Sequence, residues 1–209
     1  MKQKLTYLSL LILASIISQY NICKADIKSS LSLSHVDSIY INLVGKADSA
    51  IAQSNWTEAE NALLNAMKEQ PANPANVLLL SNLSMIQFQQ GKDSLALNTI
   101  NDAHIIAPKS ITVLNNRARI LKSMGLINEA YLTYEQILTI DSTLIEPRYM
   151  HGIIALSNKD ITTAFSDFTI LEKNAPTEEL TLDGMALYYF HIQNFTKAIP
   201  YFNKLIEIN

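Results

Sequence analysis

Residues 145–178, IEPRYMHGIIALSNKDITTAFSDFTILEKNAPTE, contain the pattern on which most of the chain is built. The stretch reads as two short amphipathic helices joined by a turn. Gly152 and Ala164 are small residues placed where two helices must approach closely, Phe168 follows Ala164 on the same helical face, and Pro176 ends the segment. The same spacing returns along the chain, so this stretch predicts one copy of a repeated helix pair.

Five copies can be aligned. We place them at residues 40–73, 77–110, 111–144, 145–178 and 179–209. The second helix of each copy has a small residue, a large apolar residue four places on and another core residue three places further, which puts all three on one face. These triplets are Ala59, Leu63, Ala66; Ala96, Ile100, Ala103; Ala130, Tyr134, Ile137; Ala164, Phe168, Leu171; and Ala198, Phe202, Leu205. Gly91 and Gly125 stand at the turns between paired helices, a place suited to a positive φ angle.

A period of 34 residues with this order of small, aromatic and proline positions resembles the tetratricopeptide repeat over residues 40–209. The resemblance implies an all-α fold, a right-handed α-solenoid in which each helix-turn-helix repeat buries its apolar face on its neighbours. Residues 26–39 read as an N-terminal spacer. Three extra residues in the segment 71–76 separate the first repeat from the second, so we expect the first repeat to stack less tightly or at a different angle.

Residues 1–25 have the pattern of a secretory signal peptide. A positive start, MKQK, precedes an apolar run at 5–17, and the Cys-Lys-Ala sequence at 23–25 predicts cleavage after Ala25. The run is too short to span a bilayer well, because about 20 apolar residues are needed. A lipid-modified Cys23 is an alternative, disfavoured by the bulky Ile22 before it. Together with the isoleucine- and asparagine-rich composition, this signal favours export to a bacterial periplasm or cell envelope.

Cleavage would leave 13 Lys and Arg against 19 Asp and Glu, a net charge of −6. This balance argues against nonspecific nucleic-acid binding, which needs a basic face. The single cysteine would leave with the signal, and the histidines, His35, His104, His151 and His191, have no metal-ligand spacing. We therefore expect no metal, no cofactor and no catalytic residues, and we expect His151 to be a packed core histidine.

The resemblance also implies a concave surface lined by the first helix of each repeat, suited to an extended peptide or a partner helix. Asn82 and Asn116 occupy positions where relatives often bind a ligand backbone, although asparagine there also belongs to the repeat consensus. Arg119 and Lys122, three residues apart, could hold a carboxylate or phosphate, or could be ordinary solvated charges. The predicted peptide-binding groove is Asn82, Met85, Phe88, Asn115, Asn116, Arg119, Lys122, Tyr149 and Phe190.

The last predicted helix, TKAIPYFNKLIEIN, carries apolar residues on more than one side. We expect Tyr201, Leu205 and Ile208 to form an exposed apolar end, with Pro200 in the first turn of the helix. Two functions follow as hypotheses. The chain is an exported scaffold that binds a protein or peptide segment in its groove within an envelope complex, or it is a structural subunit that assembles with itself or a fixed partner through this end.

Overall fold

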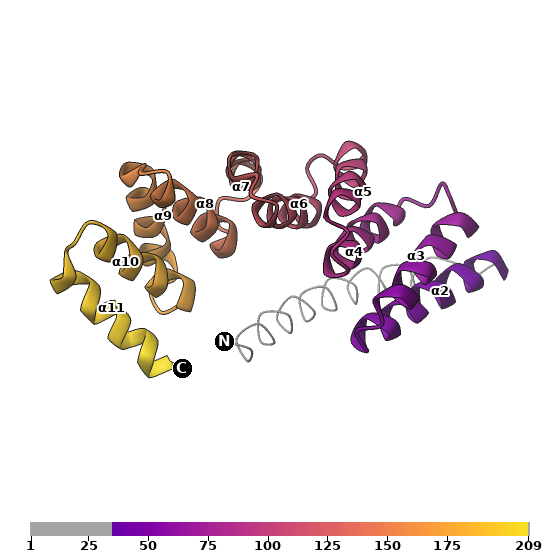
Figure 1. Cartoon of the computed structure of the whole chain (residues 1–209), viewed down its shortest axis with the longest axis horizontal. Helices are drawn as coiled ribbons and strands as arrows, with labels where there is room; N and C mark the ends of the chain where they lie inside the picture. The colour runs from indigo at the N-terminus through magenta and orange to yellow at the C-terminus, as the bar shows by residue number, and fades with distance from the viewer. Residues whose placement is uncertain (1–34, 209) are drawn as a thin grey trace. The chain divides into compact units, whose positions relative to one another are not determined.

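A computed structural model describes residues 35–208, and the expected signal peptide lies outside them. The described chain is entirely α-helical apart from turns, which confirms the predicted all-α solenoid class (Figure 1). Its helices are α2 (His35–Ala52), α3 (Trp56–Glu69), α4 (Asn76–Gln89), α5 (Asp93–Ile106), α6 (Ile111–Ser123), α7 (Ile127–Ile140), α8 (Ile145–Ser157), α9 (Ile161–Asn174), α10 (Glu179–His191) and α11 (Phe195–Ile208).

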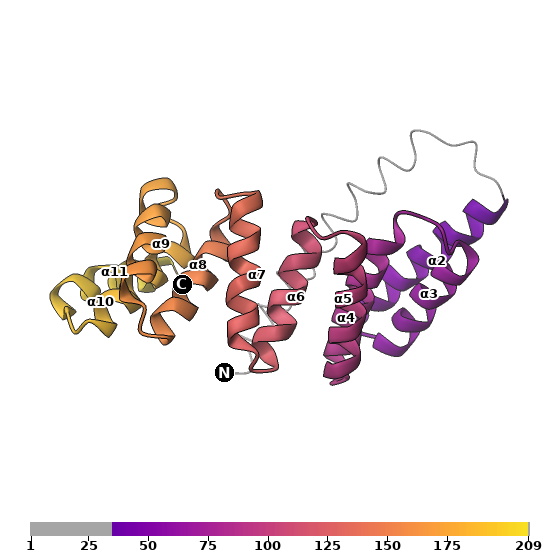
Figure 2. The ribbon, with the colours of Figure 1, turned by 90° about the horizontal axis from the view of Figure 1, so that it is seen from above.

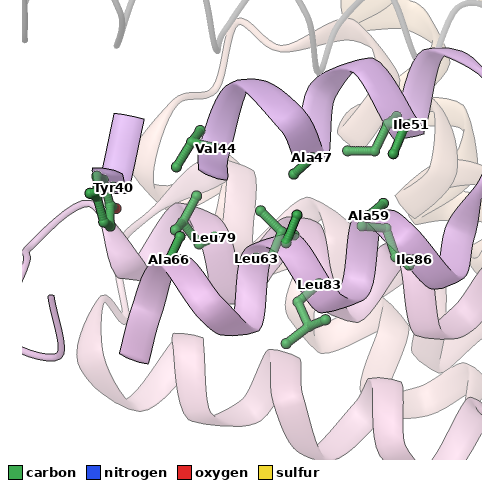
Figure 3. Close-up of a cluster of buried hydrophobic side chains, with 12 residues drawn as sticks. Tyr40, Val44, Ala47, Ile51, Ala59, Leu63, Ala66, Leu79, Leu83 and Ile86 are labelled. Atoms are coloured by element: carbon green, nitrogen blue, oxygen red, sulfur yellow. The ribbon is translucent and has the colours of Figure 1, made fainter. Parts of the chain in front are cut away.

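The chain divides into two compact units, with the boundary inside α5 between Thr99 and Ile100. In the first compact unit, α2, α3 and α4 share one core (Figure 3). Ala47 and Ala59 are completely buried and let α2 and α3 approach closely, while Leu79 and Leu83 of α4 complete the cluster. The longer linker before α4 therefore does not keep α4 out of the core.

The linker is held by side-chain hydrogen bonds to the backbone and to neighbouring side chains. Asn73 Oδ1 accepts from the Ala75 amide at 2.9 Å, and Asn76 Nδ2 donates to the Gln70 carbonyl at 2.7 Å. Tyr40 Oη donates to Asn76 Oδ1 at 3.1 Å, which ties α2 to the start of α4. Such local bonds by asparagine are typical of turns.

In the second compact unit, Phe168 of α9 lies at the centre of the packing between α8, α9 and α10. Its ring is completely buried between α8 and α10. A Cβ atom added to Gly152 would lie 2.8 Å from Phe168 Cε1, and one added to Gly184 would lie 2.5 Å from Cδ1. The two glycines are therefore required by the close approach of two helices to one aromatic ring.

The turn within each helix pair uses a residue with positive φ, two places after the first helix ends. The predicted positions Gly91 and Gly125 have φ of 73° and 78°. The other three turns place Ser54, Lys159 and Gln193 in the same conformation, at 56°, 65° and 60°. The sequence did not indicate these three, because none is a glycine.

Buried polar pairs join the helices within the middle pairs. Thr99 Oγ1 donates to Gln87 Oε1, and Arg117 Nη1 donates to Thr133 Oγ1, each at 2.7 Å. In the α8–α9 pair, the Asp167 carboxylate bonds two side chains of α8. Its Oδ1 atom lies 3.0 Å from Arg148 Nη1, and its Oδ2 atom lies 2.6 Å from His151 Nδ1.

His151 is buried, as predicted for a packed histidine. Its ring is stacked on Tyr131 of α7 with the ring centroids 4.2 Å apart. The histidine therefore joins α8 to α7 through its ring and to α9 through Asp167, and its role is to fix the packing of three helices.

Candidate peptide-binding surface

Arg119 and Lys122 of α6 form a basic step in the second compact unit, three residues apart on one face. Lys122 Nζ lies 3.9 Å from Met150 Sδ of α8. Burial lowers the pKa of Lys122, the charge of Arg119 lowers it further, and Glu146 opposes the shift. Two like charges on one face of a helix would both be stabilised by a carboxylate placed between them.

Tyr149 lies next along this surface, on α8. Its hydroxyl donates to Asp183 Oδ2 of α10 at 2.5 Å. Burial raises the pKa of Tyr149, and the bond to Asp183 raises it further. The hydroxyl therefore connects two first helices and is not free for a ligand, while the half-buried ring remains available for contact.

The structure separates the other predicted groove residues into two groups. Asn82 and Phe88 are partly exposed on α4, and Asn115 is partly exposed on α6, so these three stay predictions. Met85 and Asn116 are only 4% and 6% exposed, and their side chains are therefore not available to a partner. For Asn116 the burial favours the interpretation that this asparagine belongs to the repeat itself.

Phe190 is exposed, but it lies in a different cluster from the basic step. Its ring is 5.7 Å from the ring of Phe195 and 6.4 Å from that of Phe202, both on α11. Phe190 therefore belongs with the C-terminal aromatic residues rather than with the predicted groove.

The C-terminal end has an uncovered face, formed by Phe195, Ile199, Phe202 and Ile206 of α11. Ile199 is 55% exposed and Ile206 is 75% exposed. Phe202 is partly exposed, whereas Phe168, 34 residues earlier, is completely buried beneath α10. On α9, the position of Phe168 is covered by α10, whereas on α11 the equivalent position of Phe202 is not fully covered. Figures 1 and 2 show α11 as the last helix of the chain.

The predicted members of this end need correction. Tyr201 is partly buried and its hydroxyl donates to Glu172 of α9, Leu205 is also partly buried, and only Ile208 is well exposed. The spacing of 195, 199, 202 and 206 by four, three and four residues is the sequence signal that would have identified the open face. Pro200 is the sixth residue of α11, beyond the predicted first turn.

The repeat pattern is found independently in comparisons with known proteins. A tetratricopeptide repeat family model matches residues 111–144 and 182–209. The chain also matches the crystal structure of a tetratricopeptide repeat protein from Parabacteroides merdae ATCC 43184, with 29% sequence identity and a TM-score of 0.75. That match covers 81% of this chain and 66% of the other, so the chain spans slightly less than two thirds of that protein's length. The chain therefore contains tetratricopeptide repeats.

More distant structures share the fold of this tetratricopeptide repeat protein. MamA from Desulfovibrio magneticus RS-1 matches with 11% identity and a TM-score of 0.70, over 84% of this chain and 96% of that one. Pseudomonas aeruginosa PilF matches with 16% identity and a TM-score of 0.70, over 83% of this chain and 78% of that one. A search of curated protein sequences finds no match.

Between residues 35 and 208, no group of three or more His, Cys, Asp or Glu side chains is placed to hold a metal ion. None of the helices in the same range is both long and apolar enough to cross a membrane.

Proposed function

We propose that this tetratricopeptide repeat protein is a non-catalytic scaffold that binds an extended protein segment across α6, α8 and α10. The observation that carries the proposal is the basic step, where burial and the charge of Arg119 lower the pKa of Lys122. Two close cations at an accessible surface favour an anionic group of a ligand, and a carboxylate side chain or a chain terminus is the simplest such group in a protein.

Two neighbours would complete the recognition. The partly exposed amide of Asn115 lies one helical turn before Arg119 and offers both a donor and an acceptor to a peptide backbone. The ring of Tyr149, fixed by its bond to Asp183, offers a rigid aromatic surface. A fixed ring costs little conformational entropy on binding, which suits a recognition surface.

The test is affinity capture from the native host with two matched double variants. Arg119→Gln with Lys122→Gln removes the basic step, and Lys109→Gln with Lys173→Gln removes two exposed charges from outside it. We expect the first variant to lose most of the partner that the wild type retains, and the second to keep it. Equal recovery of the same proteins by all three versions would contradict the groove.

The uncovered face of α11 favours a second function, that of a structural subunit that assembles through its last repeat. The comparison of partly exposed Phe202 with completely buried Phe168, 34 residues earlier, supports this function, and exposed Ile206 lies on the same face as Phe202. Light scattering should show concentration-dependent association that Ile199→Lys with Ile206→Glu abolishes. A wild type that stays monomeric at high concentration would rule out self-association.

We also propose that the protein is exported and acts in a bacterial cell envelope. The proposal rests on the basic start, the apolar run and the small residues before residue 26. An exported scaffold without cysteine in its mature part would depend on its helix packing alone for stability.

A further inference from the structure

A second polar surface lies between α10 and α11, apart from the basic step. It is a shallow hollow of about 370 Å³. We call it the lysine–tyrosine hollow, and its lining residues are Tyr189, Thr196, Lys197, Pro200, Tyr201 and Lys204. None of the predicted groove residues lines it.

The cations of the hollow are held by aromatic rings rather than by carboxylates. Lys197 Nζ lies 5.2 Å from the ring centroid of Tyr189, and Lys204 Nζ lies 5.8 Å from that of Tyr201. Neither ammonium group has a carboxylate within salt-bridge distance among residues 35–208. Cation–π contacts are weak at exposed sites, so both charges remain available to an anion.

The two rings form a common floor. Tyr189 and Tyr201 are nearly parallel, with an interplanar angle of 22° and centroids 5.9 Å apart. The hydroxyl of Tyr201 is engaged by Glu172, which fixes the ring in place. The floor is therefore a preorganised surface on which an aromatic or proline side chain could stack.

Pro200 adds a hydrogen-bond acceptor. A proline has no N–H, so the usual helical bond from residue 200 to the Thr196 carbonyl cannot form. Both residues line the hollow. The Thr196 carbonyl thus lacks its usual helical donor, and in a hollow that Lys197 and Lys204 also line it can accept a backbone N–H of a peptide with acidic side chains.

We propose that the lysine–tyrosine hollow binds an acidic segment of a partner protein. Carboxylates of the segment pair with Lys197 and Lys204, which are seven residues apart and thus about 10 Å apart along the helix. An aromatic or proline side chain packs on the two tyrosine rings, and a backbone N–H donates to the Thr196 carbonyl. Two cations are too few to hold a nucleic acid on a chain of net charge −3.

The experiment is an NMR titration of the ¹⁵N-labelled chain without residues 1–25, alone and with variants. The probe is a synthetic peptide with alternating Glu and Tyr, and the matched control peptide has Gln in place of Glu. We expect shifts at Thr196, Lys197 and Lys204 with the acidic peptide, and affinity about fivefold lower for Lys197→Gln with Lys204→Gln. Arg119→Gln with Lys122→Gln should leave the shifts at Thr196, Lys197 and Lys204 unchanged, which separates binding in the hollow from any binding of the same peptide in the groove.

Several results would overturn the proposal. Two concern the peptides: an equal response to the Gln peptide, or shifts confined to residues near Arg119 and Lys122. Two concern other anions: the same shifts with inorganic phosphate alone, or binding to vesicles of anionic lipid that depends on Lys197 and Lys204 while the peptide does not bind. Pro200→Ala provides a further check, because it restores the helical bond to Thr196 and should weaken peptide binding without unfolding the helix. Thermal melts establish that each variant is folded.

Discussion

Lys159 occupies a backbone conformation that favours glycine, at a turn where two other helix pairs have Gly91 and Gly125. A residue with a Cβ atom is strained in this region. We predict that Lys159→Gly raises the free energy of unfolding by about 0.5–1 kcal/mol, since the relief of strain exceeds the entropic cost of glycine. Urea denaturation measures the change. Gly125→Lys is the matched reverse substitution and should destabilise; a loss of stability in Lys159→Gly would contradict the argument.

Gly184 and Gly45 lie at the same place in their helices, each seven residues before the helix ends. An added Cβ meets Phe168 at Gly184 and meets nothing within 4 Å at Gly45. We predict that Gly184→Ala lowers the free energy of unfolding by about 1–3 kcal/mol through overpacking. Gly45→Ala should raise it by about 0.5–1 kcal/mol through helix propensity. Similar changes for both would show that the contact with Phe168 does not matter.

At the scale of residues, the sequence correctly predicted burial where it depends only on spacing within one helix. The triplet Ala164, Phe168 and Leu171 is buried as expected from its spacing alone. Met85 and Asn116 were placed on an exposed surface and are buried instead. Whether a residue at the edge of a helix face is covered depends on the angle at which the next helix packs, and no spacing within one helix determines that angle.

At the scale of helices, the α8–α9 pair depends on the carboxylate of Asp167, which bonds both Arg148 and His151. Removing it leaves a buried guanidinium without its partner. We predict that Asp167→Asn lowers the free energy of unfolding by about 3 kcal/mol. Thr133→Val at the equivalent place in the α6–α7 pair should cost less, about 1.5 kcal/mol, because it removes a neutral acceptor from Arg117, whose Nε keeps its bond to Asn101. Urea denaturation of both variants tests this order, and a reversed order would refute it.

Acid should weaken the packing around α5. Burial lowers the pKa of His104, and the charge of Arg117 lowers it further. A group whose folded pKa lies below its unfolded value stabilises the fold above the unfolded value of 6.5, and this contribution is lost as pH falls through the folded value. We predict that stability decreases from pH 7 toward pH 5 and that His104→Gln makes this decrease smaller. His191→Gln, at an exposed position, is the control and should leave the pH dependence unchanged.

Most helices could be predicted because they carry a periodic apolar face, whereas α4 and α10 are apolar on several sides and were indicated by the repeat spacing. The polar pairs between them could not. Arg117 and Thr133, like His151 and Asp167, are 16 residues apart and meet only because two helices fold back on each other. The repeat spacing indicated which helices pair, but the hydrogen bonds between them depend on side-chain rotamers that the sequence pattern does not reveal.

At the scale of the whole molecule, the predicted export determines the compartment in which the protein would bind a partner. We expect the mature protein recovered from its host to begin at Asp26, because the small residues at 23 and 25 favour cleavage there. N-terminal sequencing of protein from the envelope fraction measures this. An intact Met1, or a lipid on Cys23, would contradict cleavage after Ala25.

The solenoid could be predicted because several weak copies of one pattern in register make a strong signal together. The binding surfaces could be predicted only in part. The basic step follows from charged residues on a first helix, whereas the lysine–tyrosine hollow requires two helices to bring Tyr189 beside Tyr201. A surface shared between helices becomes visible only when their packing is known.

The pairing of Phe168 with Gly184 also bears on how such a chain can evolve. Phe202 repeats Phe168 at an interval of one repeat, and it lies on the open face of α11. A duplicated copy of residues 179–209 would bring a second Gly184 to Phe202, and the new joint would reproduce one that the protein already makes. Lengthening by gene duplication would therefore require no new packing solution at this end.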